Sequence, residues 1–109
     1  MKTGPVAEIA FDLSFSTDKM WARLYAPERE FSGADWACAF EIDAPISVRR
    51  TIYGVSNLQA LVLGLKTMSV YLYGAEAYKN SQFGLDGEFG GNLSIPAPST
   101  LLGDAPYPF

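Results

Sequence analysis

Apolar residues recur every three or four positions between Ser56 and Lys79, and this stretch is the one long helix that the sequence predicts. Ser56 followed three residues later by Gln59 fits a capping box, in which the two side chains satisfy backbone N–H groups at the start of a helix. Ser56 is therefore the expected N-cap. One arc of the helix collects large apolar side chains that should lie on a sheet: Leu58, Leu61, Val62, Leu65, Met68 and Leu72.

The opposite arc of the same helix is almost free of charge. It carries Ala60, Leu63, Thr67, Val70, Tyr71 and Gly74. Lys66 is the one charged residue between Ser56 and Ala75, whereas an exposed helix face normally carries several. Two covers for Leu63 and Val70 remain open: the C-terminal part of the same chain, which we favour, or a partner protein. A membrane span is not expected, because polar residues interrupt the apolar run.

Period-two alternation of apolar and polar residues predicts four strands before the helix. The predicted strands are 6–15, 20–26, 36–43 and 46–52, with a polar turn at 16–19 and a charged loop at 28–35. The signal is strongest in the third strand, where Trp36, Cys38, Phe40 and Ile42 alternate with Ala37, Ala39, Glu41 and Asp43. The short Ala-Pro connection after it joins the third and fourth strands into a hairpin.

The composition changes after Lys79. Residues 80–109 contain five glycines and four prolines, which favour loops around one short strand, expected at 91–95. Apolar residues such as Phe83 and Leu93 indicate that this segment folds back on the rest of the chain.

These elements predict a single α+β domain. It begins with a loose leader at residues 1–5. A four-stranded, mostly antiparallel sheet follows at 6–54, with one long helix packed on it at 56–79. The domain ends in the Gly/Pro-rich tail with its one short strand.

Composition removes whole classes of chemistry. The 109 residues include no histidine and one cysteine, which excludes His-dependent nucleophile pairs, histidine metal sites and thiolate clusters. Cys38 lies in an apolar strand and is expected to be a buried structural thiol. Twelve acidic against eight basic residues should repel nucleic acid and attract basic partners. No secretory signal pattern is present, so the expected compartment is the cytoplasm.

Several motifs between Cys38 and Pro98 resemble a family of small, uncharacterised bacterial proteins described only as a domain of unknown function. The residues that carry the resemblance are CAFEI at 38–42, RRTIYGV at 49–55, NLQALVLGLKTM at 57–68, VYLY at 70–73 and LSIP at 93–96. The Tyr-Gly-Val segment followed by the Gln-Ala-Leu helix is the distinctive part. The resemblance implies a sheet leading to a helix and a final short strand, and it implies no catalytic residues.

Two pairs of charged residues carry little functional weight. Asp86 and Glu88 lie in a glycine-rich turn with too few ligands for a calcium loop, so no metal site is predicted. Arg49 and Arg50 are adjacent in a strand and point to opposite faces. An ion pair within the sheet is therefore expected rather than a joint anion clamp.

An acidic strip is the candidate binding surface. Glu41 and Asp43 share the side of the third strand opposite its apolar face, with Asp35 at its start and Glu28 and Glu30 in the preceding loop. The strip is either the wet face of an antiparallel sheet or a docking surface for a basic partner. In the second case Glu41 and Asp43 project away from the helix, and the five carboxylates form a field of one sign.

Two functions from different classes fit these features. The first is a non-enzymatic, cytoplasmic immunity protein that neutralises a cognate, basic bacterial toxin by masking its active site. The second is a homo-oligomeric structural or adaptor module, such as a homodimer, that associates through Leu63, Val70 and Tyr71. No catalytic residue and no cofactor is predicted, since any chemistry would have to come from Asp, Glu, Tyr, Lys or Arg alone.

Overall fold

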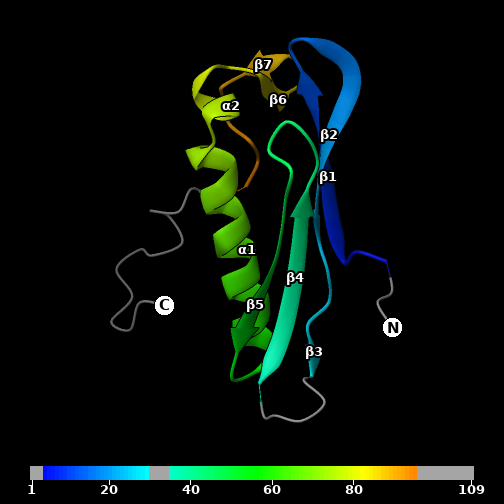
Figure 1. Ribbon diagram of the computed structural model, residues 1–109, viewed down its shortest axis with the longest axis vertical. Helices are drawn as coiled ribbons and strands as arrows, with labels where there is room; N and C mark the ends of the chain where they lie inside the picture. The colour runs from blue at the N-terminus through cyan, green and yellow to red at the C-terminus, as the bar shows by residue number, and fades with distance from the viewer. Residues whose placement is uncertain (1–3, 30–34, 96–109) are drawn as a thin grey trace.

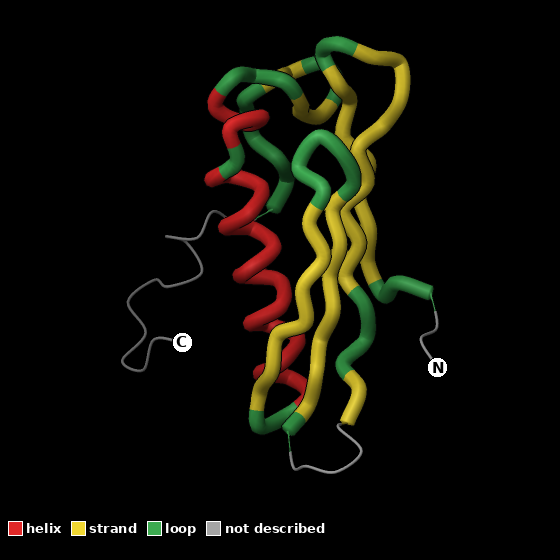
Figure 2. Tube along the Cα trace, viewed as in Figure 1, coloured by secondary structure: helices red, strands yellow, loops and turns green. Residues whose placement is uncertain are grey.

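The computed structural model describes residues 4–29 and 35–95 and has the predicted α+β architecture (Figure 1). Residues 1–3 of the expected leader lie outside this description. Five strands precede the main helix, and a short helix and a small hairpin follow it (Figure 2). The elements are β1 (Ala7–Leu13), β2 (Ser16–Leu24), β3 (Glu28–Arg29), β4 (Trp36–Ile42), β5 (Val48–Gly54), α1 (Asn57–Gly74), α2 (Glu76–Lys79), β6 (Phe83–Leu85) and β7 (Glu88–Phe89).

Strand β4 pairs with three other strands of one sheet. β5 pairs with β4 along its whole length, so β2 and β3 share the other edge of β4. β1 pairs with β2, and β6 and β7 continue the sheet beyond β1. Every pair among the described strands is antiparallel. The predicted four strands are corrected to seven, because the extra strands have only two or three residues and show no alternation in the sequence.

The hairpin between β1 and β2 differs from the prediction. The expected turn at 16–19 lies inside β2, and the chain reverses at Ser14 and Phe15 instead. Asp12 is directly opposite Lys19, and their side chains form an ion pair across the two strands. The polar residues of 16–19 lie near the end of the hairpin, where the two strands stay paired although they no longer cover the core.

Pro27 interrupts the strand that follows. The Tyr25 N–H still donates to a β4 carbonyl at 2.9 Å, but proline has no N–H, and pairing with β4 resumes only at β3. Part of the predicted loop 28–35 is therefore a short strand, and residues 30–34 lie outside the described residues. The predicted hairpin of β4 and β5 is confirmed, with β5 beginning two residues later than expected.

The start of α1 is capped as predicted, but its end is earlier. Ser56 is the N-cap, and its Oγ accepts a hydrogen bond from the Gln59 N–H at 3.1 Å. The Gln59 side chain accepts from the Val55 N–H at 2.7 Å, one residue before the position used in a standard capping box. The predicted helix 56–79 is divided at Ala75, whose extended backbone ends α1 and precedes α2.

The helix buries smaller side chains than expected. Its buried residues are Ala60, Gly64, Met68, Ser69 and Leu72. Leu58, predicted to lie on the sheet, is 67% exposed, whereas Ala60 from the predicted outer arc is fully buried. Close approach is the reason: a Cβ added to Gly64 would lie 2.8 Å from Cys38 Sγ. The helix backbone therefore rests on β4, where large side chains would not fit.

The segment after α2 folds back as predicted, but 91–95 is irregular rather than a strand. The strands of this region are β6, which pairs with β1, and β7. Leu93 is fully buried, and the Tyr73 hydroxyl donates to the Ile95 carbonyl at 2.7 Å. The Tyr73 side chain thus satisfies a backbone carbonyl that a strand partner would otherwise satisfy. Residues 96–109 lie outside the described residues.

Cys38 is buried, as predicted, and its S–H donates to the Tyr25 carbonyl at 3.3 Å. Burial raises the pKa of the Cys38 thiol, which disfavours the reactive thiolate. The cysteine is therefore part of the core. As for membranes, none of the helices within the described ranges has the length and apolar character needed to cross one.

Replacing Gly64 by valine should destabilise the protein. The new side chain must enter a space where Cys38 Sγ and Leu24 Cδ1 lie 2.8 and 3.4 Å from the Cβ position. Overpacking of this kind lowers the free energy of unfolding by about 1–3 kcal/mol, which urea denaturation measures. Gly74→Ala is the matched control, because no atom lies within 4 Å of its Cβ position. Equal losses in both variants would contradict the close contact on Cys38.

Candidate protein-binding face

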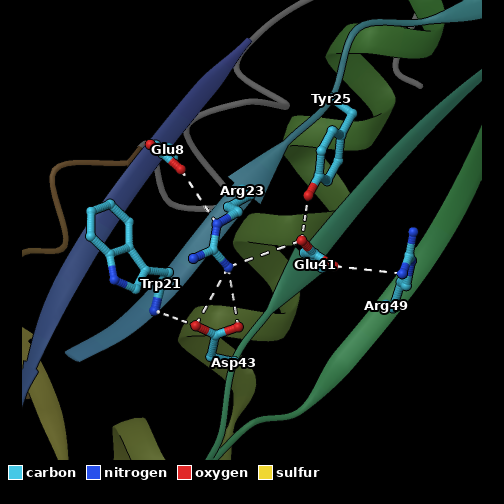
Figure 3. A network of polar contacts seen from close by, with 7 residues as sticks. All are labelled: Glu8, Trp21, Arg23, Tyr25, Glu41, Asp43 and Arg49. Carbon is cyan, nitrogen blue, oxygen red and sulfur yellow. Dashed lines mark hydrogen bonds and ion pairs between the residues drawn. The ribbon is translucent and has the colours of Figure 1, made fainter. Parts of the chain in front are cut away.

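The sheet has one buried face and one open face. Alternate residues of the central strands are buried beneath α1: Met20, Ala22, Leu24, Cys38, Phe40 and Ile42. Their neighbours in β2 and β4 point to the other face, and Figure 3 shows α1 lying behind the sheet from that side. We call this surface the open face and define it by Glu8, Trp21, Arg23, Tyr25, Glu41, Asp43, Arg49 and Tyr53.

Arg23 is the centre of a polar network on the open face (Figure 3). Its Nη1 donates to Asp43 Oδ1 at 3.2 Å and lies 4.0 Å from Glu41 Oε1. Its Nε lies 3.4 Å from Glu8 Oε2. The carboxylates come from β1, from β4 and from the residue after β4. The hydrogen bond to Asp43 and the ion pairs with Glu8 and Glu41 hold the planar guanidinium group among three carboxylates.

Glu41 extends this network to β5. Strand register places it directly opposite both Arg23 and Arg49, and its Oε2 lies 3.8 Å from Arg49 Nη1. The expected ion pair of Arg49 within the sheet is thus present, and Arg50 points to the other face. The Glu41 Oε1 accepts a hydrogen bond from the Tyr25 hydroxyl. This bond is the largest cause that raises the pKa of Tyr25 above its usual value, and desolvation adds to it.

Aromatic side chains share the open face with the network. The Arg23 guanidinium lies 5.4 Å from the centre of the Trp21 ring, a cation–π contact. On the same face, Tyr53 of β5 is 54% exposed, opposite Ala37 and four residues along β5 from Arg49. Tryptophan, tyrosine and arginine are the residue types enriched among the anchors of protein interfaces. The open face therefore combines apolar rings with donors whose orientation is already fixed.

The predicted acidic strip is only partly present. Glu41 and Asp43 lie on the face away from the helix, as predicted. Arg23 and Arg49 lie between the carboxylates, however, and three carboxylates against two guanidinium groups leave the network nearly neutral. The expected field of one sign is therefore wrong at this place, because strand pairing adds cations from β2 and β5.

The other predicted acidic residues are not part of the network. Glu28 is exposed on β3, opposite Ala37 and four residues along β4 from Glu41. Asp35 is exposed at the residue before β4. Glu30 lies outside the described residues. The network keeps two of the five predicted carboxylates, and strand register places Glu28 on the same face of the sheet, level with Tyr53.

Sequence reasoning missed Arg23, Tyr25 and Glu8 as members of the site. A signal existed for the first two, because alternation with Met20 and Ala22 puts Arg23 and Tyr25 on the side of β2 opposite its apolar residues. No local signal could connect Glu8 with Arg23, because their contact depends on the register between two strands.

The second predicted interface, Leu63, Val70 and Tyr71, is only partly accessible. Val70 is 49% exposed and Leu63 is half-buried. Tyr71 is engaged within the chain: its ring centre lies 5.8 Å from that of Phe40, and the Arg50 guanidinium lies 5.7 Å from it. The tail residues that the structure describes leave Val70 exposed, so the favoured cover is not made by residues up to 95.

The acidic turn at Asp86 and Glu88 has a structural role. Asp86 and Gly87 form the turn of the β6–β7 hairpin, and the Gly87 N–H donates to Asp12 Oδ2 at 3.2 Å. The hydrogen bond from Lys19 is the main cause that lowers the pKa of Asp12. Across residues 4–29 and 35–95, no three His, Cys, Asp or Glu side chains are grouped as metal ligands.

The ionisation of Tyr25 should respond to Glu41. Because its pKa is raised in the folded state, its stabilising contribution is complete below the unfolded pKa of about 10 and is lost as the pH rises through the higher folded value. Glu41→Gln should therefore lower the pKa of Tyr25. Ultraviolet titration, with Tyr25→Phe subtracted, isolates this phenol. An unchanged transition in E41Q would show that the hydrogen bond does not control the ionisation.

Comparison with known proteins supplies a family without an assigned activity. Searches of curated proteins and of solved structures give no significant match. A family model matches residues 10–97, a range that contains every residue of the open face except Glu8. The match is in keeping with the resemblance to an uncharacterised family. Because it covers most of the sequence, the chain belongs to this family, whose description is "Domain of unknown function (DUF6968)".

Proposed function

We propose that this protein is a non-enzymatic binding module, and specifically a bacterial immunity protein that neutralises a cognate toxin by covering its active site. The open face supports this proposal, because it gathers tryptophan, tyrosine and arginine on a rigid sheet that α1 covers only from behind. An antiparallel sheet with one wet face needs only polar residues there. Aromatic rings and a positioned guanidinium group are what an interface needs in addition.

The network lowers the cost of binding. A free arginine side chain loses rotamer freedom when it enters an interface, and such ordering costs about 0.5–1.5 kcal/mol for each flexible side chain. Arg23 is already held by Asp43 at 3.2 Å and by Glu8 at 3.4 Å. A partner that contacts Trp21 and Arg23 would therefore meet a surface whose shape exists before binding.

Charge contributes to this interface in a different way from the one the sequence suggests. The whole chain has a net charge of −4, which favours a basic partner at long range. The open face itself is nearly balanced, so Glu41 and Asp43 act mainly by holding Arg23 and Arg49. Exposed ion pairs contribute only about 0.2–1 kcal/mol each, so the aromatic anchors carry most of the expected affinity.

Co-expression tests the proposed function. A toxin encoded by the neighbouring gene should arrest growth, and this protein should restore it. Trp21→Ala and Tyr53→Ala together should abolish the rescue, because they remove two aromatic rings of the open face. Leu58→Ala is the control: this side chain is 67% exposed on α1, on the other side of the sheet, and its loss should leave the rescue intact. No rescue by the wild-type chain, or loss of rescue in all variants alike, would reject this interface.

Binding kinetics separate the two roles of charge. Glu41→Gln with Asp43→Asn removes two negative charges and also two partners of Arg23, so association should slow severalfold and dissociation should quicken. Glu76→Gln with Glu88→Gln removes the same charge from exposed residues of α2 and β7, which are not part of the network. This control should slow association only, and less so as salt shortens the Debye length, about 10 Å at 0.1 M. Equal dissociation rates in both double variants would contradict the role of the network.

A further inference from the structure

The outer edge of β5 is unpaired within the described part of the chain. β5 has seven residues, all of which pair with β4, and no described strand pairs with its other edge. An edge strand presents N–H and C=O groups that can bond to a strand of another molecule. The regular backbone of β5 makes this edge a ready surface for strand addition.

Hydrogen bonds elsewhere in the sheet identify the groups that point outward. The Tyr25 N–H donates to the Ala39 carbonyl, and the Asp43 N–H donates to the Trp21 carbonyl, both at 2.9 Å. The odd-numbered residues of β4 therefore bond to β2, and its even-numbered residues bond to β5. On β5 the even-numbered partners face inward. The backbone groups that point outward belong to Arg49, Thr51 and Tyr53.

An uncharged flank of α1 lies on the same side as this edge. Tyr71 contacts β4 and β5, whereas Leu65 lies toward β1 and β2. Around the helix axis, the residues that follow Tyr71 on the side away from Leu65 therefore point beyond β5. We call them the β5-side flank. They are Gln59, Leu63, Thr67, Val70 and Gly74. None of them is charged. The Thr67 hydroxyl donates to the Leu63 carbonyl at 2.7 Å, which satisfies its polar group within the helix.

We propose that a second copy of this chain pairs with the outer edge of β5, forming a two-fold symmetric antiparallel dimer centred on Thr51. In this register Thr51 is opposite Thr51 of the second copy, and Arg49 is opposite its Tyr53. Every outward backbone group of β5 is then bonded. The two sheets become one, and the part of the open face around Trp21, Arg23 and Asp43 stays accessible on both copies, whereas Arg49 and Tyr53 lie beside the two-fold contact. The dimer therefore goes beyond the proposed function and shares only these two residues with it.

The side chains at this register are complementary. Directly opposite residues of an antiparallel pair lie close on the same face, so Arg49 faces the uncharged Tyr53 of the second copy rather than another cation. Charged residues on an edge usually prevent such pairing. Here both arginines are turned toward groups of their own chain, Arg49 toward Glu41 at 3.8 Å and Arg50 toward Tyr71 at 5.7 Å.

The same symmetry brings the helix flanks together. Gly64 rests on Cys38 and Tyr71 lies beside Arg50, so the middle of α1 is level with Thr51. The two-fold axis then places Leu63 opposite Val70 of the second copy. Because α1 lies over β4 and β5, the axes of the two α1 helices are about two to three strand spacings of 4.8 Å apart. Apolar side chains such as Leu63 and Val70 fill much of the space between them. An exposed Val70 and a helix face without charge are then explained together.

The free part of β1 is a weaker alternative. β6 already pairs with β1 at Asp12, and the Ser14 N–H donates to the Gln82 carbonyl at 2.9 Å. By the same alternation, only Glu8 and Ala10 of β1 direct backbone groups outward beyond β6. This edge is shorter than that of β5. Its amides serve as an internal reference in the test.

Sedimentation velocity of the full chain over a wide range of concentration tests the dimer. The wild-type chain should be a dimer. Thr51→Pro removes an N–H that bonds to nothing in its own sheet, and Val70→Asp puts a charge at the helix contact; both should give folded monomers, with folding checked by circular dichroism. Leu58→Asp is the matched control, because Leu58 is 67% exposed on the opposite flank of α1, and this variant should remain a dimer.

Amide hydrogen exchange locates the contact. The amides of Arg49, Thr51 and Tyr53 should exchange at least about tenfold more slowly in the dimer than in the monomer. The exchange rates of the Glu8 and Ala10 amides should not change. A monomeric wild-type chain, a dimer that survives Thr51→Pro, or unprotected β5 amides would overturn the proposal. If Thr51→Pro fails to fold, Val70→Asp and the exchange pattern decide. A larger assembly would also overturn it, since a two-fold contact closes on itself.

Discussion

The close contact between α1 and β4 is the constraint on which the rest of the structure depends. Gly64 lies against Cys38, and a Cβ on Gly54 would lie 2.6 Å from the backbone of Ala60, so small residues set the distance between helix and sheet at two points. This distance decides which arc of the helix is buried. It turns Ala60 and Gly64 inward, although neither is large, and it leaves Val70 exposed. Packing at this density allows little other rotation of the helix.

The same sheet separates the protein into a part that provides stability and a part that is free to bind. Apolar side chains of β2 and β4 fill the core, and the residues between them form the polar network around Arg23. Because successive side chains point to opposite faces, the open face can carry charged and aromatic groups without disturbing the core. The core residues of the same strands therefore hold the backbone that carries the site. The candidate surface is held on strands rather than on loops, which fixes its geometry.

Much of the framework could be predicted from the sequence because its signals are local. The alternation around Cys38 identified β4. The start of the helix was identified by Ser56 and Gln59, and a hairpin by the short connection after β4. Each of these features depends on residues within a few positions of one another. The faces of Glu41 and Arg49 could be assigned for the same reason. Short strands such as β3 could not, because two residues carry no period.

The partners of those residues were decided only by the tertiary structure. Arg23 meets Glu8 and Asp43 because strand register aligns β1, β2 and β4, and no residue near Arg23 in the sequence specifies that alignment. A strip that is acidic when read along one strand is therefore nearly neutral across four. The sequence by itself determined which side chains share a face. Tertiary packing decided which charges meet on that face and which arc of the helix is buried, since both depend on distances between segments that are far apart in the chain.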